Sequence, residues 1–147
     1  MIEKDKIKAI LFDSGKVLNF PASGHWFISP KFYEYINKET FNKIAQEKIT
    51  NAFKRANEYI NSQSKIKTQN EELEHFLIFY NISSCIPELS LSQEEIILLA
   101  KDLVYNPEKY IFYDDALNVI PKLHKKYKLG IVSDAWPSQK IIIQVFI

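Results

Sequence analysis

The sequence predicts a mixed α/β fold in which part of a parallel sheet carries an inserted all-helical cap. Two short apolar runs, residues 7–12 and 129–132, each lead into a turn that contains an acid, as strands of a parallel sheet often do. Between them, residues 31–105 repeat apolar side chains at helical spacing. We therefore assign residues 1–19 and 110–147 to an incomplete core, and residues 20–109 to a flap followed by the helical cap.

The first strand is predicted over residues 7–12, which are apolar apart from Lys8. Such a continuous run is typical of a strand that is buried on both faces of a parallel sheet. Residues 13–15 supply a turn directly after it. Residues 16–29 then break the pattern with a proline, a Ser-Gly pair and three aromatic side chains, which predicts a loop or a small hairpin.

The cap is predicted to be a small helical bundle with clear helix starts. Thr68 is followed three positions later by Glu71, and Ser92 by Glu95, so each pair has the spacing of a capping box. Apolar residues recur on one face after each pair. Asn106 precedes a proline, which disfavours a helical conformation at this position and ends the last cap helix.

After the cap, residues 110–113 lead into Asp114 and Asp115. We interpret Asp114 as the start of a helix rather than as a metal ligand, because acidic side chains favour helix N-termini. This helix carries apolar residues up to Tyr127, and the lysines near its end suit the helix dipole as a solvated surface. Residues 129–132 then form the second buried strand.

A sheet of two parallel strands has two unpaired edges, whereas parallel sheets normally lie between layers of helices. We therefore expect further elements to follow residue 147. Residues 141–147 are uncharged and mostly β-branched, which favours an interrupted reading frame over a natural domain end and predicts a tendency to aggregate.

Composition narrows the class of protein. The chain is 46% apolar and 25% charged with a formal charge of +1, so nucleic acid is not the expected partner. Membrane association is not expected either, since the apolar runs are too short to span a bilayer and the N-terminus lacks the hydrophobic region of a signal peptide. We expect a cytoplasmic protein in which the single Cys85 is a small buried side chain.

Acids and hydroxyls follow both predicted strands. Asp13 comes directly after the first strand, and Ser133 and Asp134 follow the second. Because the carboxyl ends of parallel strands meet at one edge of a sheet, we expect these groups to converge in one pocket. Taken singly, Asp13 is also compatible with a turn former and Ser133 with a helix cap.

Residues 13–18 (Asp-Ser-Gly-Lys-Val-Leu) and 131–134 (Ile-Val-Ser-Asp), separated by a helical insertion, resemble the first two motifs of the haloacid dehalogenase-like hydrolase superfamily, helical-cap type. The resemblance implies a Rossmann-like core and hydrolysis of a small phosphorylated metabolite. It implies that Asp13 is the nucleophile that forms an aspartyl-phosphate, and that the Ser133 hydroxyl and the Asp134 backbone amide hold the phosphoryl group. It further implies a Mg²⁺ ion bound by the Asp13 side chain and the Gly15 backbone carbonyl.

The sequence departs from the family pattern at three places. Gly15 stands where the family has its general acid/base Asp, and Lys16 where it usually has glycine. The family's third motif, a lysine, and its fourth, an acidic pair, follow the second motif, and no room for them remains before residue 147. We expect little or no activity from this chain, with His25 as the nearest titratable group that could replace the missing acid.

Two alternatives remain open. A metal-independent hydrolase of the 2-haloacid dehalogenase type also uses the first Asp as nucleophile and is compatible with the absence of an acid at Gly15. A truncated or pseudogene-like product without catalysis is the other. Trp26 and Trp136 lie near the strand ends, where packing is their expected role and a place at a substrate entrance the lesser one.

Overall fold

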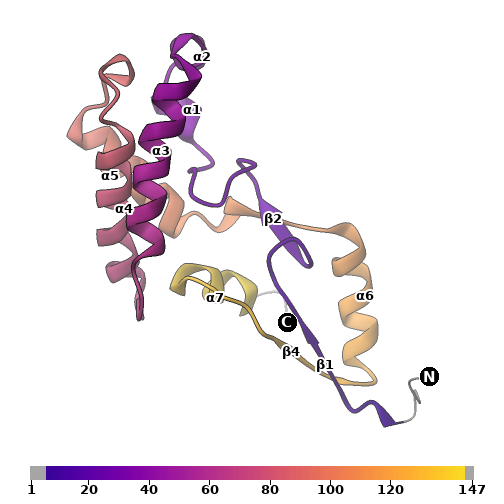
Figure 1. Ribbon diagram of the computed structural model, residues 1–147. Helices are drawn as coiled ribbons and strands as arrows, with labels where there is room; N and C mark the ends of the chain where they lie inside the picture. The colour runs from indigo at the N-terminus through magenta and orange to yellow at the C-terminus, as the bar shows by residue number, and fades with distance from the viewer. Residues whose placement is uncertain (1–5, 145–147) are drawn as a thin grey trace.

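The structure is a computed structural model that describes residues 6–144, and it combines a large helical part with a smaller sheet part (Figure 1). Helices α3, α4 and α5 pack side by side, α6 stands beside the sheet, and α7 lies between the two parts. In chain order the elements are β1 (Ala9–Phe12), β2 (Asn19–Pro21), α1 (Phe32–Tyr35), α2 (Lys38–Lys43), α3 (Gln46–Asn61), α4 (Gln69–Ser83), the short 3₁₀ helix η2 (Pro87–Leu89), α5 (Gln93–Tyr105), the 3₁₀ helix η3 (Pro107–Lys109), β3 (Tyr110–Phe112), α6 (Asp114–His124), β4 (Lys128–Ile131) and α7 (Pro137–Gln144).

The parallel sheet predicted from the sequence is present and pairs β1 with β4. Phe12 lies opposite Ile131, and the backbone amide of Val132 donates to the Phe12 carbonyl at 2.9 Å. Both strands therefore end at the same edge. The fold is mixed α/β, as predicted, but within residues 6–144 this sheet has two strands and does not amount to a full Rossmann-like core.

The prediction that both strands are buried on both faces is wrong. Leu11 is 68% exposed and Val132 64% exposed, while Ile10 and Phe12 are half-buried. The reason is that no second layer within the described residues covers this face of the sheet. Leu11 instead leans across the neighbouring strand, where a Cβ at Gly130 would lie 2.8 Å from its Cδ2 atom.

The hydrophobic core lies in the cap rather than around the sheet. Phe79 and Leu99 are fully buried where α3, α4 and α5 meet. The predicted capping boxes at Thr68 and Ser92 are both formed, and α5 ends at Asn106 as expected. The cap therefore holds together by its own apolar packing, as the periodic pattern indicated.

The two chain segments that connect the cap to the core form an antiparallel ribbon. Residues 16–29 were expected to form a loop or small hairpin, but β2 pairs with β3, with Pro21 opposite Tyr110. This pairing joins residues far apart in the sequence, so a local pattern does not reveal it. The predicted boundaries between core and cap fall within this ribbon.

Helix α6 begins at Asp114, as predicted, and the Asp115 carboxylate accepts a hydrogen bond from the Ala116 amide at 2.8 Å. The helix ends at His124, so Tyr127 lies in the turn before β4 rather than in the helix. The lysines around this end, Lys122, Lys125, Lys126 and Lys128, are exposed.

The prediction of a buried Cys85 is also wrong, because this residue follows the end of α4 and is exposed. Its thiol donates to the Asn81 carbonyl at 3.4 Å. Two other expectations concern the N-terminus and the uncharged run at residues 141–147. Residues 1–5 and 145–147 lie outside the described part of the chain. Within the run, Ile143 is described and is buried in α7. Within the part of the chain that is described, no helix combines the length and apolarity needed to cross a bilayer.

A buried polar cluster connects α7 to the cap. The Lys109 ammonium donates to the Ser138 hydroxyl at 2.5 Å and to the Leu103 carbonyl at 2.7 Å. The Ser138 hydroxyl donates to the Glu72 carboxylate, which also accepts the Ser138 amide at 2.8 Å. All three side chains are at most 4% exposed. Such a cluster is highly sensitive to the loss of one member, because the remaining charge stays buried without its partner.

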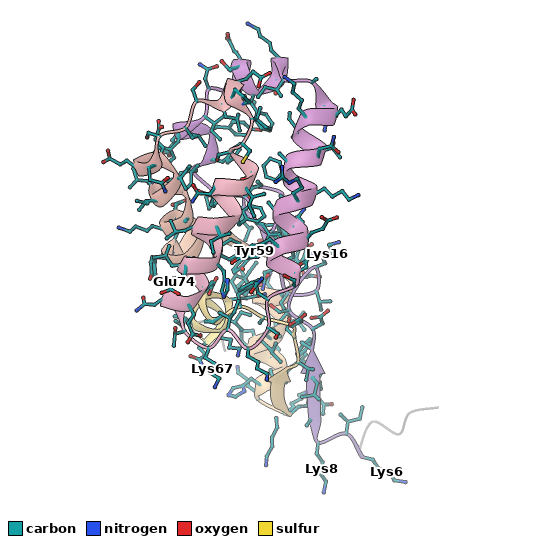
Figure 2. The ribbon with its side chains drawn as sticks, turned by 60° about the vertical axis from the view of Figure 1, so that its left-hand side comes forward. Lys6, Lys8, Lys16, Tyr59, Lys67 and Glu74 are labelled. Carbon is teal, nitrogen blue, oxygen red and sulfur yellow. The ribbon has the colours of Figure 1, made fainter. Side chains whose placement is uncertain are left out.

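The next residue of α7 connects this helix to the sheet. Gln139 donates to the buried Ser14 hydroxyl at 3.3 Å, and Asn19 donates to the same oxygen at 2.8 Å. In Figure 2, Lys6 and Lys8 lie at the end of β1 that is remote from the cap helices α3–α5, and Lys16, beyond the other end of β1, lies towards these helices.

We expect Lys109 to make the stability of the protein depend on pH. Burial lowers its pKa from 10.5 to about 8, although the charge of Glu72 opposes this shift. Between these two pH values the unfolded chain binds more protons at this group than the folded chain, so Lys109 makes the free energy of unfolding rise with pH. Urea unfolding across this range measures the slope.

In Lys109→Met this part of the slope disappears, and stability near pH 7 falls by about 3–5 kcal/mol because Glu72 keeps a buried charge without its partner. Lys126→Met is the matched control at an exposed lysine, with an unchanged slope. Identical pH slopes in the natural protein and Lys109→Met would contradict the buried position of this ammonium.

Candidate active site

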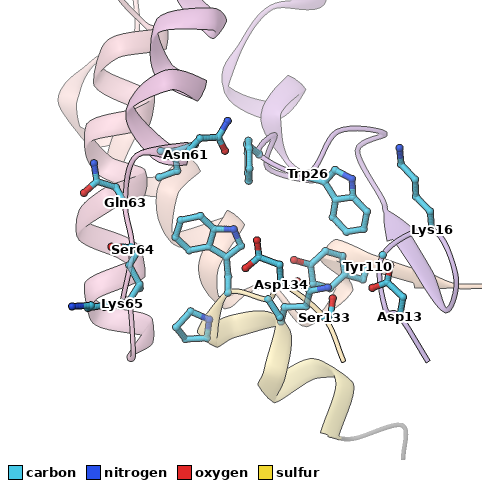
Figure 3. Close-up of a pocket in the computed structure, with 18 residues that line it drawn as sticks. Asp13, Lys16, Trp26, Asn61, Gln63, Ser64, Lys65, Tyr110, Ser133 and Asp134 are labelled. Atoms are coloured by element: carbon cyan, nitrogen blue, oxygen red, sulfur yellow. The ribbon is translucent and has the colours of Figure 1, made fainter. Parts of the chain in front are cut away.

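The acids and the hydroxyl that follow the two parallel strands line one cavity of about 730 Å³ (Figure 3). Asp13 and Ser133 lie at the edge where β1 and β4 end, and Asp134 lies beside them. The structure thus brings together the residues expected to converge, although they are 120 positions apart in the sequence. The cavity lies between this edge and the cap.

Hydrogen bonds of the buried Ser14 hold the turn that carries Asp13. Ser14 is fully buried, and its amide donates to the Asp13 Oδ1 atom at 2.7 Å. Its hydroxyl accepts hydrogen bonds from Asn19 and Gln139, so the backbone of this turn is fixed by groups from two other segments. The Asp13 side chain itself is exposed to the cavity. A carboxylate on a fixed turn is well placed to meet a ligand in a defined direction.

Trp26 occupies the space above Gly15. A Cβ atom at position 15 would lie 3.3 Å from both Cη2 and Cζ2 of this indole. That separation is closer than ordinary van der Waals contact, so a side chain at this position requires the ring to shift by a few tenths of an ångström. The position at which the resembled family has its general acid/base is therefore covered by an aromatic side chain from the flap.

Lys16 has a left-handed backbone with φ of 63°, a conformation that favours glycine. Its amide donates to the Asn19 carbonyl at 2.7 Å, which closes the turn and holds this conformation. Its side chain lies at the rim of the cavity and extends away from Asp13 (Figure 3). Lys16 thus contributes a positive charge to the rim without an ion pair to the neighbouring carboxylate.

Aromatic rings form a large part of the wall. Trp26 packs on Tyr110 with ring centroids 5.7 Å apart, and Trp136 packs on Phe76 at 5.1 Å. Both tryptophans line the cavity and remain half-buried. Trp136 also belongs to the margin of the cap core, so its packing role and its place in the cavity wall coexist.

The cap contributes polar residues that the sequence reasoning missed. Asn61, Gln63, Ser64 and Lys65 lie around the connection between α3 and α4 and line the same cavity. Lys65 has a left-handed backbone with φ of 65°, and such positions are enriched at binding sites. A polar connection between two cap helices was visible in the sequence, but which end of the bundle faces the sheet was not.

His25 does not lie in this cavity, contrary to the expectation that it could replace the missing acid. It lines a separate cavity of about 880 Å³ between the flap and helices α1–α3. Its Nδ1 atom accepts the Phe27 amide at 3.2 Å, and burial lowers its pKa. The flap turn directs His25 to one side and Trp26 to the other.

The cavity offers oxygen ligands of the kind that Mg²⁺ prefers. Asp13 and Asp134 place carboxylates along the cavity, and Gly15 also lines its wall. Among residues 6–144 no group of three or more His, Cys, Asp or Glu side chains is placed to hold a metal ion. The carboxylates that line the cavity are of the chemical type that binds Mg²⁺, a cation that usually takes several of its ligands from water and a bound phosphate.

The flap that carries Trp26 and Phe27 is attached to the cap. The Ser29 amide donates to the Tyr80 hydroxyl at 2.8 Å, and this hydroxyl donates to the Phe27 carbonyl at 3.3 Å. Asp102 accepts hydrogen bonds from the Ser29 hydroxyl and, at 3.0 Å, from the Lys31 amide. One wall of the cavity is therefore held by buried hydrogen bonds from α4 and α5.

Comparison of the chain with models of protein families, with curated proteins and with solved structures gives no match in any of the three. The site is accordingly interpreted from its own residues.

We expect Tyr80→Phe to destabilise the protein by about 1–3 kcal/mol, because it leaves the Ser29 amide and the Phe27 carbonyl without their buried partner. Tyr105→Phe is the matched control, since the Tyr105 hydroxyl bonds to Asn70 at the exposed surface. Chemical unfolding of both variants measures the difference. Equal stability of the two variants would mean that Tyr80 does not anchor the flap.

Proposed function

We propose that the cavity is the active site of a haloacid dehalogenase-like phosphohydrolase that hydrolyses a small phosphorylated metabolite. The observation that carries the proposal is the meeting of Asp13 and Ser133 in one cavity, at the ends of two paired parallel strands. A carboxylate and a hydroxyl at this edge are the groups that the resemblance requires. Hydrogen bonds hold the turn that carries Asp13. Phosphoryl transfer depends on such positioning of the nucleophile.

In the proposed reaction an Asp13 carboxylate oxygen attacks the phosphorus atom of a phosphate ester. The bond from phosphorus to the ester oxygen breaks, and this oxygen departs with the electron pair as an alkoxide, which takes a proton from water. Water then attacks the phosphorus atom of the aspartyl-phosphate, which releases inorganic phosphate and restores the carboxylate. Asp13 has the one property this step needs most, a fixed direction of approach, because Ser14 fixes its turn.

Ser133 and the backbone after it are proposed to hold the phosphoryl group. The hydroxyl of Ser133 and the amide of Asp134 would donate to phosphoryl oxygens, where charge develops during transfer. The Asp13 carboxylate and the Gly15 carbonyl would hold Mg²⁺, with Asp134 as a further carboxylate within the cavity. When bound, Mg²⁺ supplies charge that offsets the repulsion between a phosphate and these carboxylates.

The absence of an acid at Gly15 limits the proposed rate. General acid–base catalysis typically contributes about 10²–10⁴-fold, so departure of a poor leaving group is slow in this protein. A leaving group that departs as a stable anion depends less on this assistance. The activity expected here is therefore weak and greatest for activated esters.

A second candidate, metal-independent hydrolysis of a carbon–halogen bond, is favoured by the indole of Trp26 above Gly15. Halide departs without a proton, so a site closed by an aromatic ring at this position suits that reaction. Chloride release from 2-chloropropionate without Mg²⁺, abolished in Asp13→Asn, would select this candidate over the phosphohydrolase.

For the phosphohydrolase we expect slow, Mg²⁺-dependent hydrolysis of p-nitrophenyl phosphate. Asp13→Asn removes the nucleophile and abolishes it, and Ser133→Ala lowers kcat by about 10²-fold because a donor to the phosphoryl group is lost. Asp115→Asn serves as the control, since this acid lies outside the cavity at the start of α6. Release of p-nitrophenolate measures all four proteins. Turnover that persists without Mg²⁺ or in Asp13→Asn would reject the mechanism.

The space above Gly15 yields a separate prediction. Gly15→Asp alone gives little gain, since its Cβ would meet the Trp26 ring at 3.3 Å. Combined with Trp26→Leu, which vacates that space, it should raise hydrolysis of glycerol 2-phosphate by up to about 10²-fold, because this alcohol leaves poorly without an acid.

The control for this experiment is Gly15→Asn with Trp26→Leu, which has the same size but no acid. Phosphate release is the measurement. A gain that appears equally in the Asp and Asn double variants would show that space, rather than proton transfer, limits the reaction.

A further inference from the structure

We propose that the molecule bound in the 730 Å³ cavity is a phosphate monoester whose alcohol carries a flat heteroaromatic ring, stacked on Trp26. The proposal rests on the phosphohydrolase function for its phosphate end, whereas the ring end depends on separate residues. The cavity volume is in the range that accommodates a drug-sized ligand and far exceeds a phosphoryl group. Most of the ligand must therefore contact residues other than Asp13 and Ser133.

The residues next to the proposed phosphate position are aromatic. Trp26, Phe27, Tyr110 and Trp136 all line the cavity, and they come from the flap, β3 and the segment before α7. Trp26 lies directly over Gly15, two positions from Asp13, so a ring stacked on this indole is within reach of a phosphate held at the strand ends. Flat rings stack on such side chains in offset or edge-on arrangements.

These rings are supported from behind and therefore present fixed surfaces. Tyr110 backs Trp26 at 5.7 Å, and Phe76 backs Trp136 at 5.1 Å. Phe27 packs on Phe79 at 5.9 Å. The hydrogen bonds from Tyr80 and Asp102 hold the flap in place. A wall that does not need to be ordered by its ligand loses little entropy on binding.

The cap side of the cavity is polar and fits the edge of a heteroaromatic ring. Asn61 places an amide there, which carries both donors and acceptors, and Ser64 adds a hydroxyl, whereas the Gln63 amide donates to the Tyr59 carbonyl and the Ser62 hydroxyl. Side-chain amides recognise the edges of heteroaromatic bases by such paired hydrogen bonds. Apolar faces next to a polar edge match a heteroaromatic ring better than a purely aliphatic chain.

The test is binding by isothermal titration calorimetry in the presence of Mg²⁺, with adenosine 5′-monophosphate, glucose 6-phosphate and adenosine as probes. Measurements use the natural protein with the non-hydrolysable phosphonate analogues of the two phosphate esters, so that Asp13 stays in place and no turnover occurs. We expect the nucleotide to bind at least about tenfold more tightly than the sugar phosphate, as stacking on one aromatic side chain provides. Trp26→Leu should abolish this difference, and Trp26→Phe should retain most of it.

Phe20→Leu is the matched control, because Phe20 stacks on Tyr113 at 5.0 Å and does not line the cavity. Circular dichroism confirms that each variant is folded. Equal affinity for the nucleotide and the sugar phosphate overturns the proposal, as does a nucleotide affinity that is unchanged in Trp26→Leu. If adenosine binds as tightly as the nucleotide and this binding is lost in Trp26→Leu, the phosphate does not contribute to binding. That result would refute the phosphate site and the phosphohydrolase function, while the stacking site for the ring would stand.

Discussion

The position of the cavity depends on two consecutive residues at the start of α7. Ser138 bonds to Glu72 and Lys109 of the cap side, and Gln139 bonds to Ser14 below Asp13. The β2–β3 ribbon and the packing of Trp136 on Phe76 also join the two parts of the molecule. The first turn of α7 therefore sets the distance between the strand ends and the cap, and with it the size of the cavity.

The first turn of α7 makes this connection through buried polar groups, next to the apolar packing of Trp136 on Phe76. Removing a lysine and a carboxylate from water is unfavourable, and their attraction offsets it only when hydrogen bonds complete the arrangement. Here Ser138 links the two charges, and Leu103 supplies a carbonyl to the ammonium. Because these bonds are directional, they admit one relative position of cap and sheet, whereas apolar side chains tolerate sliding.

Local patterns in the sequence predicted what local physics determines. The capping boxes at Thr68 and Ser92 and the start of α6 at Asp114 follow from neighbouring residues, and the apolar runs of β1 and β4 indicated two strands of a parallel sheet. The β2–β3 pairing, the exposure of Leu11 and the place of His25 depend on which segments meet in space. Nothing in a single sequence specifies those meetings.

The sequence predicted the candidate site only in part. The strand ends that place Asp13 and Ser133 together follow from parallel pairing, but the role of Trp26 depends on how the flap folds back. The position of the flap places the Trp26 ring over Gly15, where the resembled family has its acid. A side chain at position 15 would press on the indole above it, because its Cβ would lie 3.3 Å from the ring, so glycine suits this position as long as Trp26 stays in place. If the proposed hydrolysis takes place here, the glycine withholds proton transfer from the leaving group and the indole adds a surface for binding, so discrimination would depend on the body of the ligand more than on the ester bond.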